Sequence, residues 1–163
     1  MTNYFARLDP QELALAQKVF EVSHSVSLTG SQTTNFQIKT GAKAPLILAL
    51  EVSSSAEPCK LTMLETPTIT NGTTVVTAYN MFRPSSVAAT TLFYSDPTGI
   101  SGGTAVNVHI ITAGKGGSAI SSESGAWVLK KNTSYVLKVE QLSNQATTVA
   151  FNVVLAEDFP SAP

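Results

Sequence analysis

The sequence predicts an all-β fold, an antiparallel β-sandwich or jelly roll of about nine to ten strands with a short N-terminal helix. Of the 163 residues, 43% are hydrophobic and only 13% are charged, and Ser and Thr supply much of the polar remainder. Threonine is β-branched and suits a pleated sheet, whereas the Lys and Glu residues that cover helix exteriors are scarce. Apolar and polar residues also alternate in many short runs separated by turn-forming segments, which is typical of sandwiches.

The first predicted element is a helix over about residues 10–18, where apolar residues recur at helical spacing. Asp9 can cap this helix, Pro10 suits its first turn, and Glu12 stands three residues after the cap. The period changes to two at Phe20. We therefore divide the chain into an N-terminal arm and short helix, residues 1–19, and a single β-sandwich domain, residues 20–163.

Alternating or continuous apolar runs then predict the strands. They span residues 20–28, 35–40, 45–53, 60–65, 73–79, 90–95, 105–112, 126–130, 132–142 and 147–155. The run 45–53 is apolar on both faces and is expected to be a central strand. The Gly- and Ser-rich segments 95–103 and 113–125 predict loops.

The last two strands read as a pair joined by the turn "SNQA". Alternation places one set of side chains on each inward face of this predicted hairpin. The sets are Tyr135, Leu137 and Val139, and Val149, Phe151, Val153 and Leu155.

Candidate catalytic and metal-binding residues are few. His24 and His109 are the two histidines, and neither has a His, Asp or Cys at metal-ligand spacing. Cys59 is the single cysteine, which excludes an internal disulfide. The segment "AGKGGSA" at 113–119 does not have the spacing of a phosphate-binding loop. We therefore expect no enzymatic activity, no metal and no cofactor.

The net charge of −1 provides no basic surface for nucleic acid or an anionic membrane, so we expect neither as a partner. The first residues lack the basic start and apolar run of a secretory signal. Synthesis in a cytoplasm is therefore expected.

Two segments carry apolar and aromatic residues outside any periodic element. One is the N-terminal arm, with Tyr4, Phe5 and Arg7; the other is a break between strands, with Met81, Phe82 and Arg83. Aromatic residues, Met and Arg are enriched at the centres of protein interfaces. Both segments are candidate partner contacts, although Phe82 could instead fold back over the end of the sandwich.

A family resemblance adds to this interpretation. The segment 127–153 resembles a C-terminal pattern in small virion proteins of tailed bacteriophages, and "NGTTVVTAYNMFRPSS" and "TLFYSDPTGISGGT" are similar to its middle region. The resemblance covers about residues 65–155. The matching residues of the last segment are Trp127, Leu129, Lys130, Asn132, Thr133, Tyr135, Leu137, Val139, Leu142 and Ser143.

The resemblance implies a capsid decoration (cement) or related head structural protein: a β-sandwich without catalysis that binds the major capsid protein in many copies on the virion. The local symmetry of capsids suggests self-association, most simply as a trimer. The alternative is a tail or fibre module that recognises host-surface glycan. Sugar sites use exposed aromatic platforms, so an exposed Trp127 beside a groove would favour that alternative.

Overall fold

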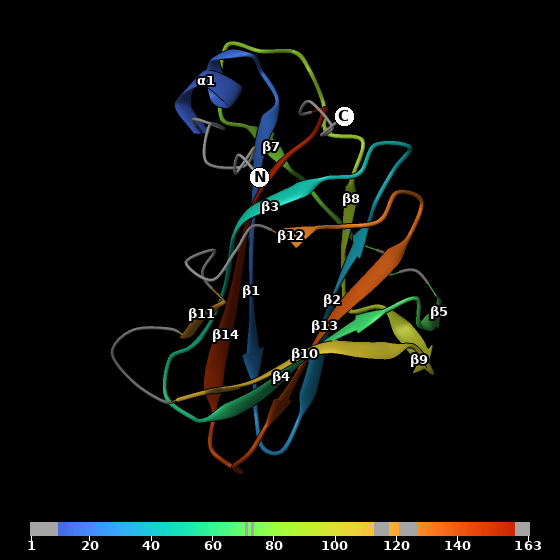
Figure 1. Cartoon of the computed structure of the whole chain (residues 1–163). Coiled ribbons are helices and arrows are strands. Elements are labelled where there is room, and N and C mark those ends of the chain that lie inside the picture. Colours follow the sequence, from blue (N-terminus) through green and yellow to red (C-terminus); the bar gives the residue numbers. More distant parts are fainter. Residues whose placement is uncertain (1–9, 71, 73, 113–117, 121–126, 159–163) are drawn as a thin grey trace, which may run out of the picture.

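The protein is a β-sandwich of two antiparallel sheets, which confirms the predicted fold class. The computed structural model describes residues 10–70, 72, 74–112, 118–120 and 127–158. A first sheet has the strand order β11-β3-β14-β1-β7, with β12 also pairing with β3, and a second sheet has the order β10-β4-β13-β2-β8-β6. The two sheets form the body of the molecule in Figure 1, and a small third sheet, β5-β9, lies beside it.

The elements have the following bounds: α1 Pro10–Leu15, β1 Val19–Leu28, β2 Thr33–Lys39, β3 Leu46–Ser54, β4 Cys59–Glu65, β5 Thr68–Thr70, β6 Thr74–Val76, β7 Tyr79–Asn80, β8 Leu92–Ser95, β9 Thr98–Ser101, β10 Thr104–Ile111, β11 Ser118–Ile120, β12 Trp127–Val128, β13 Ser134–Gln141 and β14 Thr147–Ala156. There are more strands than the nine or ten expected, because several are only two to four residues long.

The helix α1 is shorter than the predicted range 10–18. It ends because Gln17 adopts a left-handed conformation with φ of 61°. The amide of Lys18 then donates to the carbonyl of Leu13 at 3.0 Å, and the amide of Gln17 donates to that of Ala14 at 2.9 Å, a Schellman ending. This turns the chain directly into β1 at Val19. The predicted cap, Asp9, lies outside the described residues.

The last two long strands do not form the predicted hairpin. Strand β13 pairs with β2 and β4 in the second sheet, whereas β14 pairs with β1 and β3 in the first. The turn 142–146 therefore carries the chain from one sheet to the other (Figure 1). The predicted inward faces are nevertheless correct, because all seven side chains are buried in one core. The two strands face each other across the sandwich instead of sharing hydrogen bonds.

Aromatic rings fill the centre of this core. The ring of Phe36 on β2 lies 5.1 Å from that of Phe151 on β14, which joins the two sheets. Phe93 on β8 and His24 on β1 stack on the same Phe36 ring at 6.0 and 5.8 Å. His24 thus belongs to the core packing, as its position on the apolar face of its strand predicts.

The segment 95–103, expected to be a loop, contains strand β9, which pairs with β5. Glycines 102 and 103 turn the chain from β9 into β10 with φ of 64° and 84°, a region that other residues rarely adopt. The predicted loop 113–125 lies outside the described residues except for the backbone of β11.

Candidate partner-binding surface

The loop between β7 and β8 exposes two of the three residues that the sequence selects there, Met81 and Arg83. Met81 is 47% exposed, and Tyr79, two residues before it, is also exposed. The guanidinium carbon of Arg83 lies 4.8 Å from the centre of the Tyr79 ring, within the range of a cation–π contact. Phe82 is half-buried, which is intermediate between an exposed partner contact and a side chain folded back over the end of the sandwich. An aromatic ring, a thioether and a guanidinium are therefore presented together at this loop.

A buried amide ties this loop to the end of α1 and to itself. The Asn80 side chain donates from Nδ2 to the carbonyls of Gln17 and Val87, at 3.0 and 3.3 Å. Its Oδ1 accepts from the amide of Phe82 at 2.9 Å. Ser85 donates from Oγ to Oε1 of Gln17 at 2.6 Å and accepts from the Val87 amide at 2.9 Å. The backbone that carries the exposed side chains is thus held by hydrogen bonds. Binding to a partner would therefore cost little conformational entropy in this loop.

A buried carboxylate holds the far side of the same loop. Glu157, at the end of β14, accepts hydrogen bonds from the amide and hydroxyl of Thr90 at 2.8 and 2.9 Å. It also accepts from the amide of Thr91 at 2.7 Å. These three donors compensate for the burial of the carboxylate. Sequence reasoning did not assign a role to Glu157, and no motif around it signals one.

The base of the loop also packs beside the end of α1, where a groove of about 370 Å³ opens. Lys18 and Lys43 border it, and both hold Asp158. Lys18 donates from Nζ to the Asp158 carbonyl at 2.8 Å, and the Lys43 ammonium lies 3.2 Å from its carboxylate. Apolar Val87 and Ala88 form part of the other wall. A groove of this volume is large enough to hold an amino-acid side chain.

The second predicted contact segment cannot be placed, because Tyr4, Phe5 and Arg7 lie outside the described residues. The arm joins the described chain at Pro10, the first residue of α1. In Figure 1, α1 and β7 lie at the same end of the sandwich. The structure therefore brings the attachment point of the arm to the same end of the molecule as Met81, Phe82 and Arg83.

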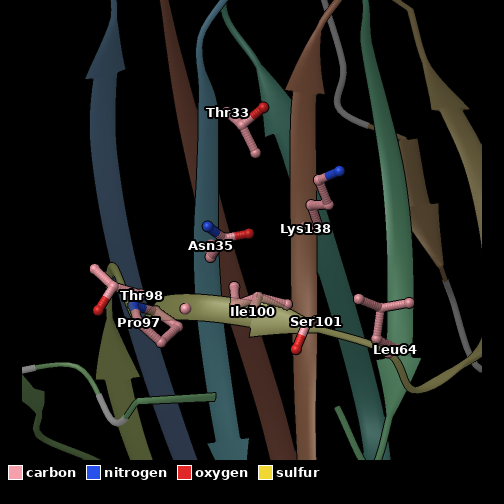
Figure 2. A pocket seen from close by; sticks show the side chains of 10 residues that line it. Thr33, Asn35, Leu64, Pro97, Thr98, Ile100, Ser101 and Lys138 are labelled. Atoms are coloured by element: carbon pink, nitrogen blue, oxygen red, sulfur yellow. The ribbon is translucent and has the colours of Figure 1, made fainter. Parts of the chain in front are cut away.

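A second groove, of about 470 Å³, lies on the outer face of the second sheet. Figure 2 shows Ile100 and Ser101 of β9 crossing in front of the strands that carry Asn35 and Lys138. The buried Oδ1 of Asn35 accepts no hydrogen bond from any described residue. The lining residues include hydroxyls and an ammonium but no aromatic ring. Trp127 is half-buried and packs against the core, so it offers no exposed platform beside this groove.

One titratable cluster ties the end of β4 to the chain before β13. Lys130 donates from Nζ to Oε1 of Glu65 at 2.6 Å, and the Tyr135 hydroxyl donates to Oε2 at 3.0 Å. The Lys130 ammonium holds the pKa of Glu65 below its ordinary value. Burial raises the pKa of the Tyr135 phenol, and the Glu65 carboxylate adds to that shift. The cluster is a structural tie, since Tyr135 also accepts from the Lys130 amide at 2.9 Å.

The residues best suited to chemistry are engaged in packing. Burial raises the pKa of the Cys59 thiol, which disfavours the nucleophilic thiolate. Within the described residues, no three His, Cys, Asp or Glu side chains gather where they could hold a metal ion. Nor does that part of the chain contain a helix long and apolar enough to span a membrane.

Comparison with models of known protein families, with curated proteins and with solved structures finds no match for this chain.

Proposed function

We propose that this chain is a virion structural protein that binds the outer surface of a bacteriophage capsid and stabilises or decorates it. The major capsid protein would be its partner. The resemblance of residues 65–155 to small virion proteins supports a location on the bacteriophage virion. The Tyr79, Met81 and Arg83 cluster supports protein binding, and it is the observation on which the proposal depends.

The physical reason is that the cluster combines the features of an interface centre. Aromatic, Met and Arg side chains contribute large contact areas, and a fixed loop loses little conformational entropy on binding. The net charge of −1 gives little long-range attraction, so attachment has to depend on short-range contacts repeated in many copies.

The test measures occupancy on capsids that lack the protein. The double substitution Met81→Ser with Arg83→Ala removes the thioether and the guanidinium without touching the Asn80 base. The matched control is Leu142→Ser, which is 53% exposed compared with 47% for Met81 and lies in the turn that follows β13. That turn is at the opposite end of the sandwich from α1 (Figure 1).

Capsids mixed with each protein are sedimented, and the bound protein is quantified, with circular dichroism as the check on folding. We expect a loss of at least about tenfold in affinity for the double variant, equal to about 1.4 kcal/mol, and no change for the control. Equal binding by the two variants would remove the loop from the mechanism. Failure of the unaltered protein to bind any capsid would refute the proposed function.

The N-terminal arm is tested separately by deleting residues 1–8. We expect weaker capsid occupancy or self-association with the sandwich still folded, because these residues precede every described element. Unchanged occupancy together with an unchanged sedimentation coefficient would leave the Met81–Arg83 loop as the remaining candidate.

A second candidate function is glycan recognition by a phage tail or fibre. The polar lining of the groove favours it, since hydroxyls and an ammonium can form hydrogen bonds with sugar hydroxyls. The absence of an aromatic ring among the described lining residues weighs against it. Binding to a panel of bacterial surface glycans that is lost in Asn35→Ala, with capsid binding absent, would favour this candidate over the first.

A further inference from the structure

The edges of the two sheets are unequal in length. In the part of the chain that the structure describes, the first sheet ends at β11, β12 and β7, which have three, two and two residues. The second sheet ends at β6, with three residues, and at β10, with eight. Short edge strands offer few unpaired main-chain groups, and this is one way in which proteins prevent edge-to-edge pairing. Strand β10, with eight residues, is long enough to pair with another strand.

The side chains of β10 do not protect it either. The strand TAVNVHII contains no Lys, Arg, Asp, Glu or Pro, the residues that usually discourage another strand from pairing. Its outward side chains are apolar: Val108 is 56% exposed, and Val106 and Ile110 are also exposed. A bulge at Val106, which has no register partner on β4, bends the start of the strand, so the Val106–Ile110 pair of the register below lies outside the regular segment at the axis. The strand from Asn107 onward stays in regular register with β4, and its other edge has no partner strand among the described residues.

From Val106 to Ile110, the alternation of apolar and polar residues in β10 is the same when the strand is read in the opposite direction. Antiparallel pairing of two copies about a two-fold axis at Val108 places Val106 of one copy opposite Ile110 of the other. The same register places Asn107 opposite His109. Apolar residues thus meet apolar residues on the outer face, and polar residues meet polar residues on the other. An interface between two copies related by a two-fold axis requires this kind of self-complementarity, whereas an interface with an unrelated protein does not.

Charge is compatible with the same arrangement. The nearest charged side chain of the outer face is Lys60 on β4, which is paired with Ile110 and stands one strand away from the edge. Its ammonium lies 4.0 Å from the Glu140 carboxylate of β13, so it is attracted back into its own sheet. No like charges are brought opposite each other by the pairing, a juxtaposition that would destabilise it.

We propose that β10 is the self-association surface of this protein: two copies pair antiparallel through it, with Val108 at the two-fold axis. The second sheet then continues from one copy into the other, and the exposed valines and isoleucine contact their counterparts across the two paired strands. The pairing gives a dimer, and thus differs from the ring of three that capsid symmetry suggests. It depends on the edge strand and not on the capsid setting, so dimerisation and capsid binding can succeed or fail independently.

The test compares two exposed valines on opposite edges of the same sheet. Val108→Lys places an ammonium at the axis, where it meets its own copy, whereas Val75→Lys on β6 is a control with 58% exposure compared with 56%. Sedimentation equilibrium gives the dimer dissociation constant of the unaltered protein and of both variants, and circular dichroism with urea unfolding checks the fold. We expect Val108→Lys to weaken the dimer by at least about tenfold and Val75→Lys to leave it unchanged.

A second measurement reports the register. Val108→Cys puts two thiols opposite each other at the axis, within reach of a disulfide, so mild oxidation should yield a covalent dimer. Val75→Cys should not cross-link, and the natural Cys59 is buried. A protein that is monomeric at its highest soluble concentration would overturn the proposal. So would a trimer that tolerates Val108→Lys, or equal effects of the two lysine variants.

Discussion

Phe151 is the residue at which the sandwich should be most sensitive to truncation. Its side chain is buried, and its neighbours in register are His24 on β1 and Val52 on β3. Its ring faces that of Phe36 across the core, with centroids 5.1 Å apart and an interplanar angle of 16°. Phe151→Ala therefore removes contacts within one sheet and between the two sheets at once.

The expected loss in the free energy of unfolding is about 3–5 kcal/mol. Returning the ring to water costs about 2 kcal/mol of transfer free energy. The cavity adds about 1–2 kcal/mol because strands on both sides limit its collapse. Loss of the contact with Phe36 adds about 0.5–1 kcal/mol. Since a domain is usually stable by about 5–15 kcal/mol, this single change removes a large part of the total.

Urea unfolding followed by the fluorescence of Trp127, the single tryptophan, measures the loss. Phe151→Leu keeps most of the volume and should cost less, below about 1.5 kcal/mol. The exposed substitution Val75→Ala should stay within about 0.5 kcal/mol of the unaltered protein. A loss below about 1 kcal/mol for Phe151→Ala would show that the ring is not in the core, and that the register of β14 is shifted by one residue.

Three further predictions concern buried and titratable groups. Glu157→Gln should lower the free energy of unfolding, measured in urea, by about 1–3 kcal/mol, and it should increase proteolysis of residues 81–91. The reason is that an NH2 group, which cannot accept a hydrogen bond, can then face the amide and hydroxyl donors of Thr90. Lys130 lowers the pKa of Glu65, so stability should fall as the pH drops below 4.5, and Glu65→Gln should flatten that part of the profile. Burial raises the pKa of Tyr135, so stability should also fall as the pH rises above 10.0, and Tyr135→Phe should reduce that slope.

Each of these predictions has an outcome that contradicts it. Unchanged proteolysis in Glu157→Gln would mean that the loop is held without its carboxylate. An acid profile of Glu65→Gln that superimposes on that of the unaltered protein would show that Glu65 titrates alike in the folded and unfolded chains. The same comparison between pH 9 and pH 11, at 0.15 M salt, tests Tyr135.

The sequence predicts the fold class and the buried faces well, because alternation reports directly which side of a strand is apolar. Tyr135 and Phe151 were placed inward on that basis, and both are buried. Alternation does not report which strand lies beside which. The strands 134–141 and 147–156 are close in the sequence and joined by a short turn, which favoured a hairpin. Their actual neighbours lie up to 137 residues away in the chain, as Val19 does from Ala156, and no local pattern encodes such pairing.

Only the residue types of the candidate contact loop can be read from the sequence. Met81 and Arg83 were chosen by residue type, and the structure exposes them on a fixed loop. The groups that fix the loop, Asn80 and Glu157, could not be chosen because their partners come from distant segments. The exposed face of β10 was missed for a different reason. Alternation would bury Val108 and its apolar neighbours, and only the packing of the two sheets shows that these side chains lie on the outer face.

The transfer of the chain from sheet to sheet has a consequence for synthesis on the ribosome. Strand β1 lies between β14 and β7, so its longest partner is a strand made more than a hundred residues later. At about 5–20 residues per second, β1 and β3 wait on the order of ten seconds for the strand that joins them. During that interval their apolar faces are available to chaperones and to other nascent chains. A ribosome that stalls before residue 147 therefore releases a product with no central strand in its first sheet, and such a chain is a substrate for proteases rather than a smaller version of the fold.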